Sequence, residues 1–122
     1  MKIRDVIERY YEYANEGAWD RWCDLFDPDM RMDEQLAGRV EGREKLREMM
    51  SGFPAMYSSF RNTWRYLLVD GDQAAVVSHI SAATPDGRSI EADAMNYFQV
   101  RRGHITYMAN FHDTAPFRGV GQ

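Results

Sequence analysis

Two adjacent carboxylates, Asp33 and Glu34, end the segment MRMDE at residues 30–34, and their spacing decides which of them can do chemistry. If this segment is a β-strand, alternate side chains share a face, so Glu34 points the same way as Met30 and Met32. The methionines predict that this face is the inner one. A carboxylate in an apolar interior is costly when ionised, which favours a hydrated position, a hydrogen-bonded one or a role in proton transfer.

The other candidates are polar residues within apolar patterns. Asp33 has polar neighbours on its own face and is predicted to be solvated. Tyr10 lies on the apolar face of a predicted helix, where it serves either packing or hydrogen bonding. Asn96 lies between residues predicted to be buried, so it belongs to a polar pocket or to a structural network. His79 is a lone histidine in an apolar strand, and a pocket role for it becomes more plausible if His112 lies on the same face.

A metal centre is not expected. His79, His112 and Glu34 match no metal-ligand spacing, and the single cysteine, Cys23, excludes both a cysteine cluster and an internal disulfide. Its helical setting predicts a packing role for Cys23. We therefore expect no cofactor.

Length, composition and charge limit the number of domains and the kinds of partner that the chain can have. A chain of 122 residues that is 44% hydrophobic can bury one core, which predicts a single domain over residues 1–122. The net charge of −4, with scattered basic residues, argues against nucleic acid as a partner. The chain contains no apolar run of membrane-spanning length and no leader pattern, so we expect a cytoplasmic protein without membrane contact.

The hydrophobic pattern predicts helices first and strands later. Apolar residues at spacings of three and four predict a first helix that begins at residue 3 and ends at residues 15–17, and further helices over residues 19–26 and 46–53. From about residue 58 the period changes to two, which predicts strands over residues 58–70, 74–84, 88–100 and 105–113. This order indicates an α+β fold in which N-terminal helices pack in a strongly curved, mainly antiparallel sheet. Such a cone encloses an internal pocket.

A family resemblance adds to this pattern. The segments ERYYEYANEGAWDRWCDLFDPDMRMDE, GRVEGREKLREMM and GHITYMANFHD, in this order, resemble the nuclear transport factor 2-like superfamily, and within it the SnoaL-like polyketide cyclases and ketosteroid isomerases. The resemblance to the isomerases implies that Glu34 is the base, that the Tyr10 hydroxyl binds the developing enolate oxygen, and that Asn96 is the second donor to that oxygen.

Limonene epoxide hydrolases of the same superfamily provide a second template. Their catalytic triad would fall on His79, Val77 and Asn110, and because valine and asparagine cannot perform two of the three roles, that mechanism is not expected. This resemblance still implies that His79 and Asn110 face the pocket, with Met108 and His112 on the same face. SnoaL-like cyclases also use a late aspartate, which keeps Asp113 as an alternative to Glu34.

These observations favour a cofactor-independent enzyme that moves a proton on a small, apolar cyclic or polyketide-like carbonyl compound. The predicted catalytic residues are Glu34, Tyr10, Asn96 and His79. The predicted substrate-binding residues are Asn110, His112, Met108, Trp64 and Met32. Two alternatives stay open: a non-catalytic pocket for an apolar ligand, and a dehydratase or hydrolase assisted by the histidines. The resemblance also implies a homodimer formed through the exposed face of the sheet.

Overall fold

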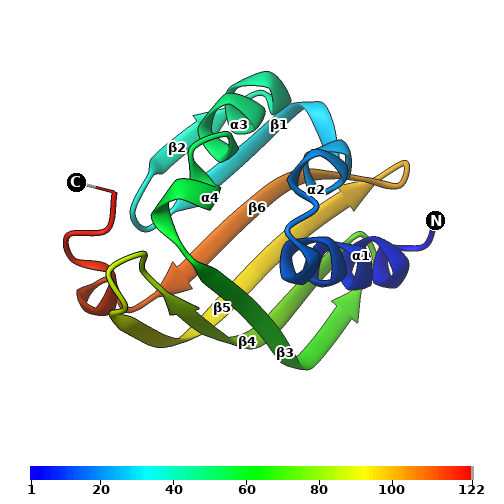
Figure 1. Cartoon of the computed structure of the whole chain (residues 1–122). Coiled ribbons are helices and arrows are strands. Elements are labelled where there is room, and N and C mark those ends of the chain that lie inside the picture. Colours follow the sequence, from blue (N-terminus) through cyan, green and yellow to red (C-terminus); the bar gives the residue numbers. More distant parts are fainter. Residues whose placement is uncertain (122) are drawn as a thin grey trace.

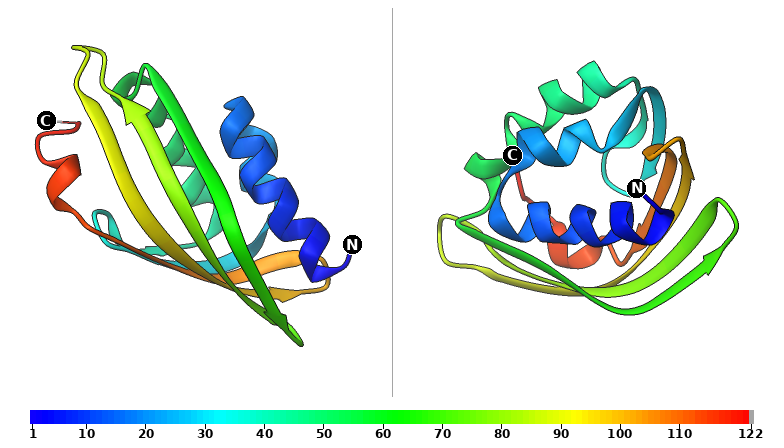
Figure 2. Two further views of the ribbon diagram at one scale, coloured as in Figure 1. Left: turned by 90° about the horizontal axis from the view of Figure 1, so that it is seen from below. Right: turned by 90° about the vertical axis from the view of Figure 1, so that its right-hand side faces the viewer.

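The computed structural model describes residues 1–121, which form an α+β fold with the helices on the concave side of a strongly curved sheet (Figures 1 and 2). The helices are α1 (Ile3–Glu16), α2 (Trp19–Asp24), α3 (Arg43–Met50), α4 (Phe53–Met56) and the 3-10 helix η1 (Ala115–Phe117). The strands are β1 (Phe26–Glu34), β2 (Gly38–Glu41), β3 (Ser59–Asp70), β4 (Gln73–Ala83), β5 (Ser89–Arg101) and β6 (His104–His112). The predicted fold class is confirmed.

Within residues 1–121 the sheet has six strands in the order β2-β1-β6-β5-β4-β3. All neighbours are antiparallel except β1 and β6, which run parallel and bring the first and last strands together. The sheet does not close, so β2 and β3 form its two edges. No helix among the described residues is both long enough and apolar enough to cross a membrane.

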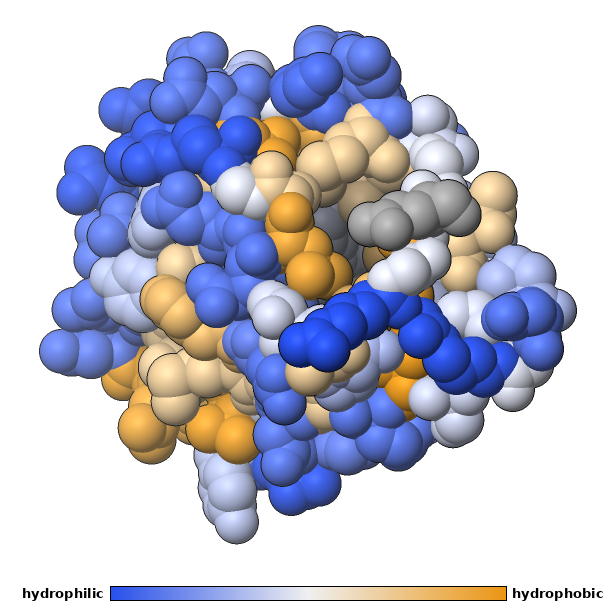
Figure 3. All heavy atoms as spheres, turned by 90° about the vertical axis from the view of Figure 1, so that its left-hand side faces the viewer, coloured by the Kyte–Doolittle hydropathy of each residue, from blue (hydrophilic) through white to orange (hydrophobic). Residues whose placement is uncertain are grey.

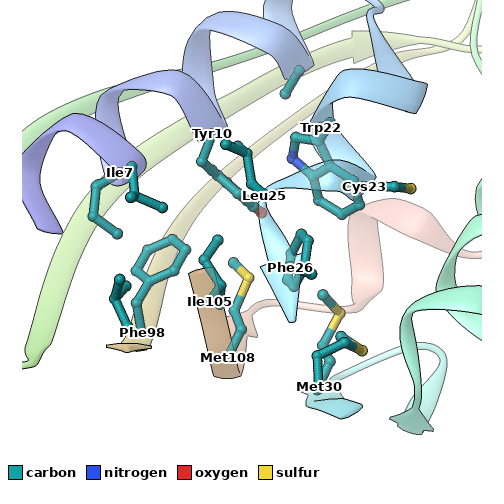
Figure 4. Close-up of a cluster of buried hydrophobic side chains, with 14 of the residues drawn as sticks. Ile7, Tyr10, Trp22, Cys23, Leu25, Phe26, Met30, Phe98, Ile105 and Met108 are labelled. Atoms are coloured by element: carbon teal, nitrogen blue, oxygen red, sulfur yellow. The ribbon is translucent and has the colours of Figure 1, made fainter. Parts of the chain in front are cut away.

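Helix α1 covers the concave face because its apolar residues recur at helical spacing and all point to one side. The buried residues of this side are Val6, Ile7, Tyr10, Tyr11 and Ala14. The helix ends where the sequence predicts, at Gly17, whose φ of 70° is a conformation that glycine adopts without strain. Figure 4 shows how Ile7 and Tyr10 of this helix pack over Phe98 and Ile105 of the sheet.

Strand β3 contains a β-bulge that the sequence pattern does not reveal. Regular alternation predicts that Trp64, Tyr66 and Leu68 share the inner face, but the pairing with β4 shifts between Trp64 and Tyr66. The extra residue reverses the facing of the side chains that follow it. Leu67 therefore packs against the core, while Tyr66 and Leu68 are 67% and 72% exposed.

Two short elements were not predicted. Strand β2 follows the turn after Glu34 and pairs with β1, with Val40 beside Met32. Helix α4 begins shortly after α3 and has Pro54 in its first turn, a position where proline favours the start of a helix. In Figure 1, β2, α3 and α4 lie on the side of the molecule away from β3 and β4.

Candidate active site

A cavity of about 840 Å³ lies between the concave face of the sheet and the helices. Figure 3 views the molecule from the left-hand side of Figure 1 and shows a hollow there that is bordered by hydrophobic residues. Most of the lining is apolar, with side chains from α1 to α4, β3 and β4. Six of the residues predicted from the sequence line it: Tyr10, Met32, Glu34, Asn96, Asn110 and His112.

Glu34 enters this cavity from the last position of β1. As the alternation predicts, it shares the inner face with Met30 and Met32, which are buried. Its carboxylate is not unpaired, because Oε2 accepts hydrogen bonds from the backbone N–H groups of Leu36 and Ala37 at 2.7 and 2.9 Å. The turn after β1 thus fixes the position of the carboxylate.

His112, at the end of β6, holds the other oxygen of this carboxylate. Its Nε2 atom lies 2.9 Å from Oε1 of Glu34, and its Nδ1 atom lies 2.9 Å from the backbone carbonyl oxygen of Asp113. A carbonyl oxygen only accepts hydrogen bonds, so Nδ1 carries a proton. An ionised carboxylate also only accepts, so Nε2 carries a second proton and the ring is an imidazolium.

The pKa values of both groups follow from this pairing. Burial raises the pKa of Glu34, but the hydrogen bonds from His112, Ala37 and Leu36 outweigh burial and hold that pKa below its usual value. The hydrogen bond to Glu34 raises the pKa of His112 against the opposing effect of its burial. Burial alone would raise the pKa of this carboxylate, and the donors of the following turn and of β6 reverse that direction.

Asn96 lies at the centre of a buried hydrogen-bond network beneath the cavity. Its Oδ1 atom accepts a hydrogen bond of 2.6 Å from the hydroxyl of Tyr11 and a longer one of 3.5 Å from Ser78. Its Nδ2 atom donates to Oδ1 of Asn110 at 2.8 Å. These bonds orient Asn110 so that its own Nδ2 group makes no hydrogen bond within residues 1–121 and is left to serve the cavity.

Tyr10 and Tyr11 are neighbours with different surroundings. The Tyr11 hydroxyl is committed to Asn96, whereas the Tyr10 hydroxyl has no hydrogen-bond partner among the described residues and the residue lines the cavity. Burial raises the pKa of Tyr10, and the charge of Glu34 adds to this effect, so the hydroxyl remains a protonated donor. Tyr10 is also held by edge contacts with the rings of Tyr11 and Phe98.

His79 does not face the cavity, contrary to expectation. The even-numbered residues of β4 are the buried ones, from Ala74 to Ala82, and His79 lies on the opposite, convex face. There its ring nitrogens lie 2.9 Å from carboxylate oxygens of Asp93 and Glu91, which raise the pKa of His79. The inward position was implied by the epoxide hydrolase resemblance alone, and the alternation of β4 in this chain contradicts it.

Two predicted contact residues also lie outside the cavity. Met108 faces inward but is completely buried in the core below the cavity, next to Phe98 and Ile105 (Figure 4). Trp64 packs against the core from the middle of β3, with the guanidinium of Arg4 6.0 Å from its ring centre. The parity of both residues is as expected, but the helices cover their part of the concave face.

The alternative carboxylates have other partners. Asp33 lies on the opposite face of β1, where it accepts a hydrogen bond from the Tyr107 hydroxyl at 2.6 Å and pairs with Arg39 at 2.8 Å. Asp113 is exposed and accepts a hydrogen bond of 3.0 Å from the backbone N–H of Ala115, the first residue of the 3-10 helix. Among residues 1–121, no group of three or more His, Cys, Asp or Glu side chains is arranged to hold a metal ion.

The sequence reasoning missed two contributors to the site. Tyr11 was read only as an apolar helix residue, although two adjacent tyrosines on a buried helix face indicate that at least one hydroxyl needs a partner. The segment after β6 received no site role from the sequence, but its Phe117 is buried, with its ring centre 4.9 Å from that of His112. The single aromatic residue in TAPFRGVG is the signal that could have located this wall.

A strongly curved sheet with helices on its concave side, and a mainly apolar cavity whose lining includes Glu34 and His112, define a protein of the α+β class. The SnoaL-like domain model matches residues 7–108. The chain therefore belongs to the SnoaL-like domain family. No curated protein sequence matches the chain.

Solved structures show the same fold. TerC, co-crystallised with polyporic acid, has a TM-score of 0.83 and 19% identity, and the match covers 95% of each chain. IdmH of Streptomyces antibioticus, a candidate polyketide cyclase, has a TM-score of 0.82 and 21% identity, also over 95% of each chain. A candidate ketosteroid isomerase of Kribbella flavida has a TM-score of 0.74 and 23% identity, over 92% of this chain and 78% of its own. At these identities the likeness establishes the fold alone.

Proposed function

We propose that this protein is a cofactor-independent enzyme of the isomerase or cyclase type that moves a proton on a small, largely apolar carbonyl compound. The observation that carries the proposal is the Glu34–His112 pair at the surface of an otherwise mainly apolar cavity. A pocket that only binds apolar ligands requires no ion pair in its wall, and an ion pair removed from water contributes little to stability on balance. A role in proton transfer accounts for the presence of the pair.

Glu34 is the group that meets the substrate. The carboxylate has about four acceptor positions, and the bonds from His112, Leu36 and Ala37 occupy three of them. The remaining position takes the proton from the carbon next to the substrate carbonyl, and the electron pair moves to the carbonyl oxygen. Both nitrogens of His112 are engaged, so its role is to keep Glu34 ionised and oriented.

Tyr10 and Asn110 bind the oxygen on which negative charge develops. Each has a donor without a partner among residues 1–121, and each lines the cavity with Glu34. Asn96 contributes through Asn110 and not through the substrate. Its amide orients Asn110 and is itself held by the hydroxyl of Tyr11. Neutral donors that are already oriented stabilise an enolate more than its carbonyl precursor, which is the requirement for catalysis.

The substrate is proposed to be a cyclic or polyketide-like carbonyl compound. Support comes from the aromatic and methionine side chains of the lining, which suit flat apolar molecules, and from structural relatives named as candidate polyketide cyclases or isomerases. The enolate formed by Glu34 then either receives the proton back at another carbon, which is isomerisation, or attacks a second carbonyl carbon, which closes a ring. In the second case the C=O π bond of that carbonyl breaks, and its oxygen takes the proton from Glu34 to become a hydroxyl.

Deuterium exchange tests this proposal without a known product. The wild-type protein in D2O is expected to exchange hydrogen for deuterium at the carbon next to the carbonyl of one or more ketones in a panel of cyclic and polyketide-like compounds, as followed by NMR. Glu34→Gln should reduce that exchange by about 10²- to 10⁴-fold. Binding of 2-naphthol, a phenolic mimic of the enolate, should be retained in this variant. Binding without exchange across the panel would show a non-catalytic ligand-binding protein instead.

We also propose that the protein forms a homodimer through the convex face of the sheet. Tyr66, Val77, Met95 and Phe111 are paired in register across β3, β4, β5 and β6 and form one row, which we name the outer apolar row. Met95 and Phe111 are 46% and 51% exposed. A second copy would cover this row by symmetry.

A further inference from the structure

Asn62 is a buried polar residue that the chemistry above does not use. It lies on the inner face of β3, 5% exposed, and lines the cavity between Phe60 and Trp64 along the strand. Its partner across the sheet is Ile80, an apolar residue. An apolar side chain would therefore suit this position at least as well for packing alone.

The backbone of Asn62 is held independently of its side chain. Because β3 is an edge strand, its outward-facing backbone groups have no neighbouring strand. The Asn15 carboxamide takes that place: its Oδ1 accepts from the N–H of Asn62 at 2.7 Å, and its Nδ2 donates to the carbonyl oxygen of Asn62 at 3.0 Å. The Asn62 side chain is thus not needed to hold the strand against α1.

The Asn62 carboxamide makes no hydrogen bond to any residue in the described part of the chain, and its Oδ1 is buried without a partner. This contrasts with Asn96, whose amide has partners on three residues. Native proteins satisfy most buried polar side chains, so an unsatisfied amide in a cavity wall indicates a partner that arrives with the ligand. Its terminal torsion is soft, so a half turn presents either the N–H donor or the carbonyl acceptor.

The position of Asn62 defines the shape of that ligand. Glu34 and His112 lie on β1 and β6, whereas Asn62 lies on β3, at the opposite edge of the sheet. The cavity lining includes the apolar residues Ile80 and Ala94 on the strands between. A molecule that reaches both ends carries polar groups at two separated positions on an apolar body.

We propose that Asn62 is a substrate-binding residue that hydrogen-bonds a second oxygen function of the ligand, a hydroxyl or carbonyl remote from the reacting carbonyl. The substrate class is thereby narrowed to flat apolar compounds with oxygen functions at both ends. This inference rests on the proposed function for the place of the reacting end near Glu34. Its test measures binding alone, so it can fail or succeed independently of catalysis.

The experiment compares 2-naphthol with 2,6- and 2,7-dihydroxynaphthalene by calorimetric titration of the wild type and of Asn62→Leu. One or both diols should bind the wild type about 3- to 10-fold more tightly than 2-naphthol, as one neutral hydrogen bond provides, and Asn62→Leu should abolish that gain. Affinity for 2-naphthol itself should be unchanged. Asn62→Ala serves the same comparison if the leucine variant does not fold.

The matched control is Thr63→Val, which removes a polar group from the adjacent, exposed position of β3. This variant should keep the full preference for the diol. A wild-type protein that binds both diols no better than 2-naphthol, or a preference that persists in Asn62→Leu, overturns the inference. A lost preference in a protein that shows no deuterium exchange would uphold Asn62 as a binding residue while the catalytic proposal fails.

Discussion

The Nε2 atom of His112 lies 2.9 Å from Oε1 of Glu34, and only 5% of the histidine side chain is exposed. The two residues come from the ends of β1 and β6, and the backbone around each supplies its remaining hydrogen bonds. An ion pair with both members fixed by the backbone has little freedom to rearrange. A change of pH is therefore expected to alter the charges of the two residues and not their positions.

The first prediction concerns that pH dependence. The lowered pKa of Glu34 means that its contribution to stability is present above its usual value of 4.5 and is lost as the pH falls through the lowered pKa. The raised pKa of His112 means that its contribution is full below 6.5 and is lost as the pH rises through the raised pKa. Urea unfolding should show the largest difference between wild type and His112→Asn between these two values, and a smaller difference on either side.

A companion experiment measures 2-naphthol binding in His79→Asn against pH, because His79 also has a raised pKa but lies on the convex face with Asp93 and Glu91. Its removal should leave the pH dependence of 2-naphthol binding in the cavity unchanged. A stability difference for His112→Asn that stays constant from acid to alkaline pH would show that the Glu34–His112 pair is not charged.

The second prediction separates two adjacent tyrosines. Tyr11→Phe leaves Oδ1 of Asn96 with only the long bond from Ser78, so the free energy of unfolding should fall by about 1 kcal/mol. Tyr10→Phe removes a hydroxyl without a partner among residues 1–121 and should leave stability nearly unchanged. Affinity for 2-naphthol should fall several-fold in Tyr10→Phe. Equal losses of stability in the two variants would contradict the assignment of their hydroxyls.

The third prediction concerns the segment after β6. Phe117 is buried against His112 and forms part of the cavity wall. Phe117→Ala should lower the free energy of unfolding by roughly 3 kcal/mol, the low end for a buried phenylalanine, and should weaken 2-naphthol binding. Val120→Ala, also in this wall but only half-buried, provides the control. Unchanged thermal melting of Phe117→Ala would show that this segment does not pack on the cavity in solution.

The fourth prediction addresses the outer apolar row. Phe111→Glu places a charge at the β6 end of this row and should shift the protein from dimer to monomer in sedimentation velocity experiments. Leu36→Glu, a similar change at an exposed residue in the turn between β1 and β2, should leave the dimer intact. A wild-type protein that sediments as a monomer at micromolar concentration would refute the dimer directly.

Local sequence patterns predict the elements well because each depends on neighbours along the chain. The end of α1 near Gly17 and the inward facing of Glu34 both follow from periodicity over a few residues. The bulge before Tyr66 could not be predicted in this way, since it arises from pairing with β4 and no residue of β3 marks it. One inserted residue was enough to invert the predicted facing of Tyr66 and Leu68.

The candidate site was harder to predict than the fold because it depends on partners distant in sequence. Parity identified the inner face of Glu34, and the epoxide hydrolase template together with parity identified that of Asn110 and His112, but neither could reveal that Glu34 and His112 touch. That contact and the two backbone donors lower the pKa of Glu34, although burial raises it. His79 failed because its inward position came from the template alone, and the alternation of β4 in this chain places it on the convex face.

The parallel pairing of β1 with β6 determines when the site can assemble during synthesis. Glu34 and His112 are separated by 78 positions, so Glu34 leaves the ribosome long before its partner is made. Until residues 104–112 emerge and dock beside β1, the carboxylate of Glu34 has no His112 to pair with. The methionine and aromatic side chains of the core are also exposed to solvent during this time. Loop closure over this distance is slow, and that interval is when the chain most needs protection from aggregation.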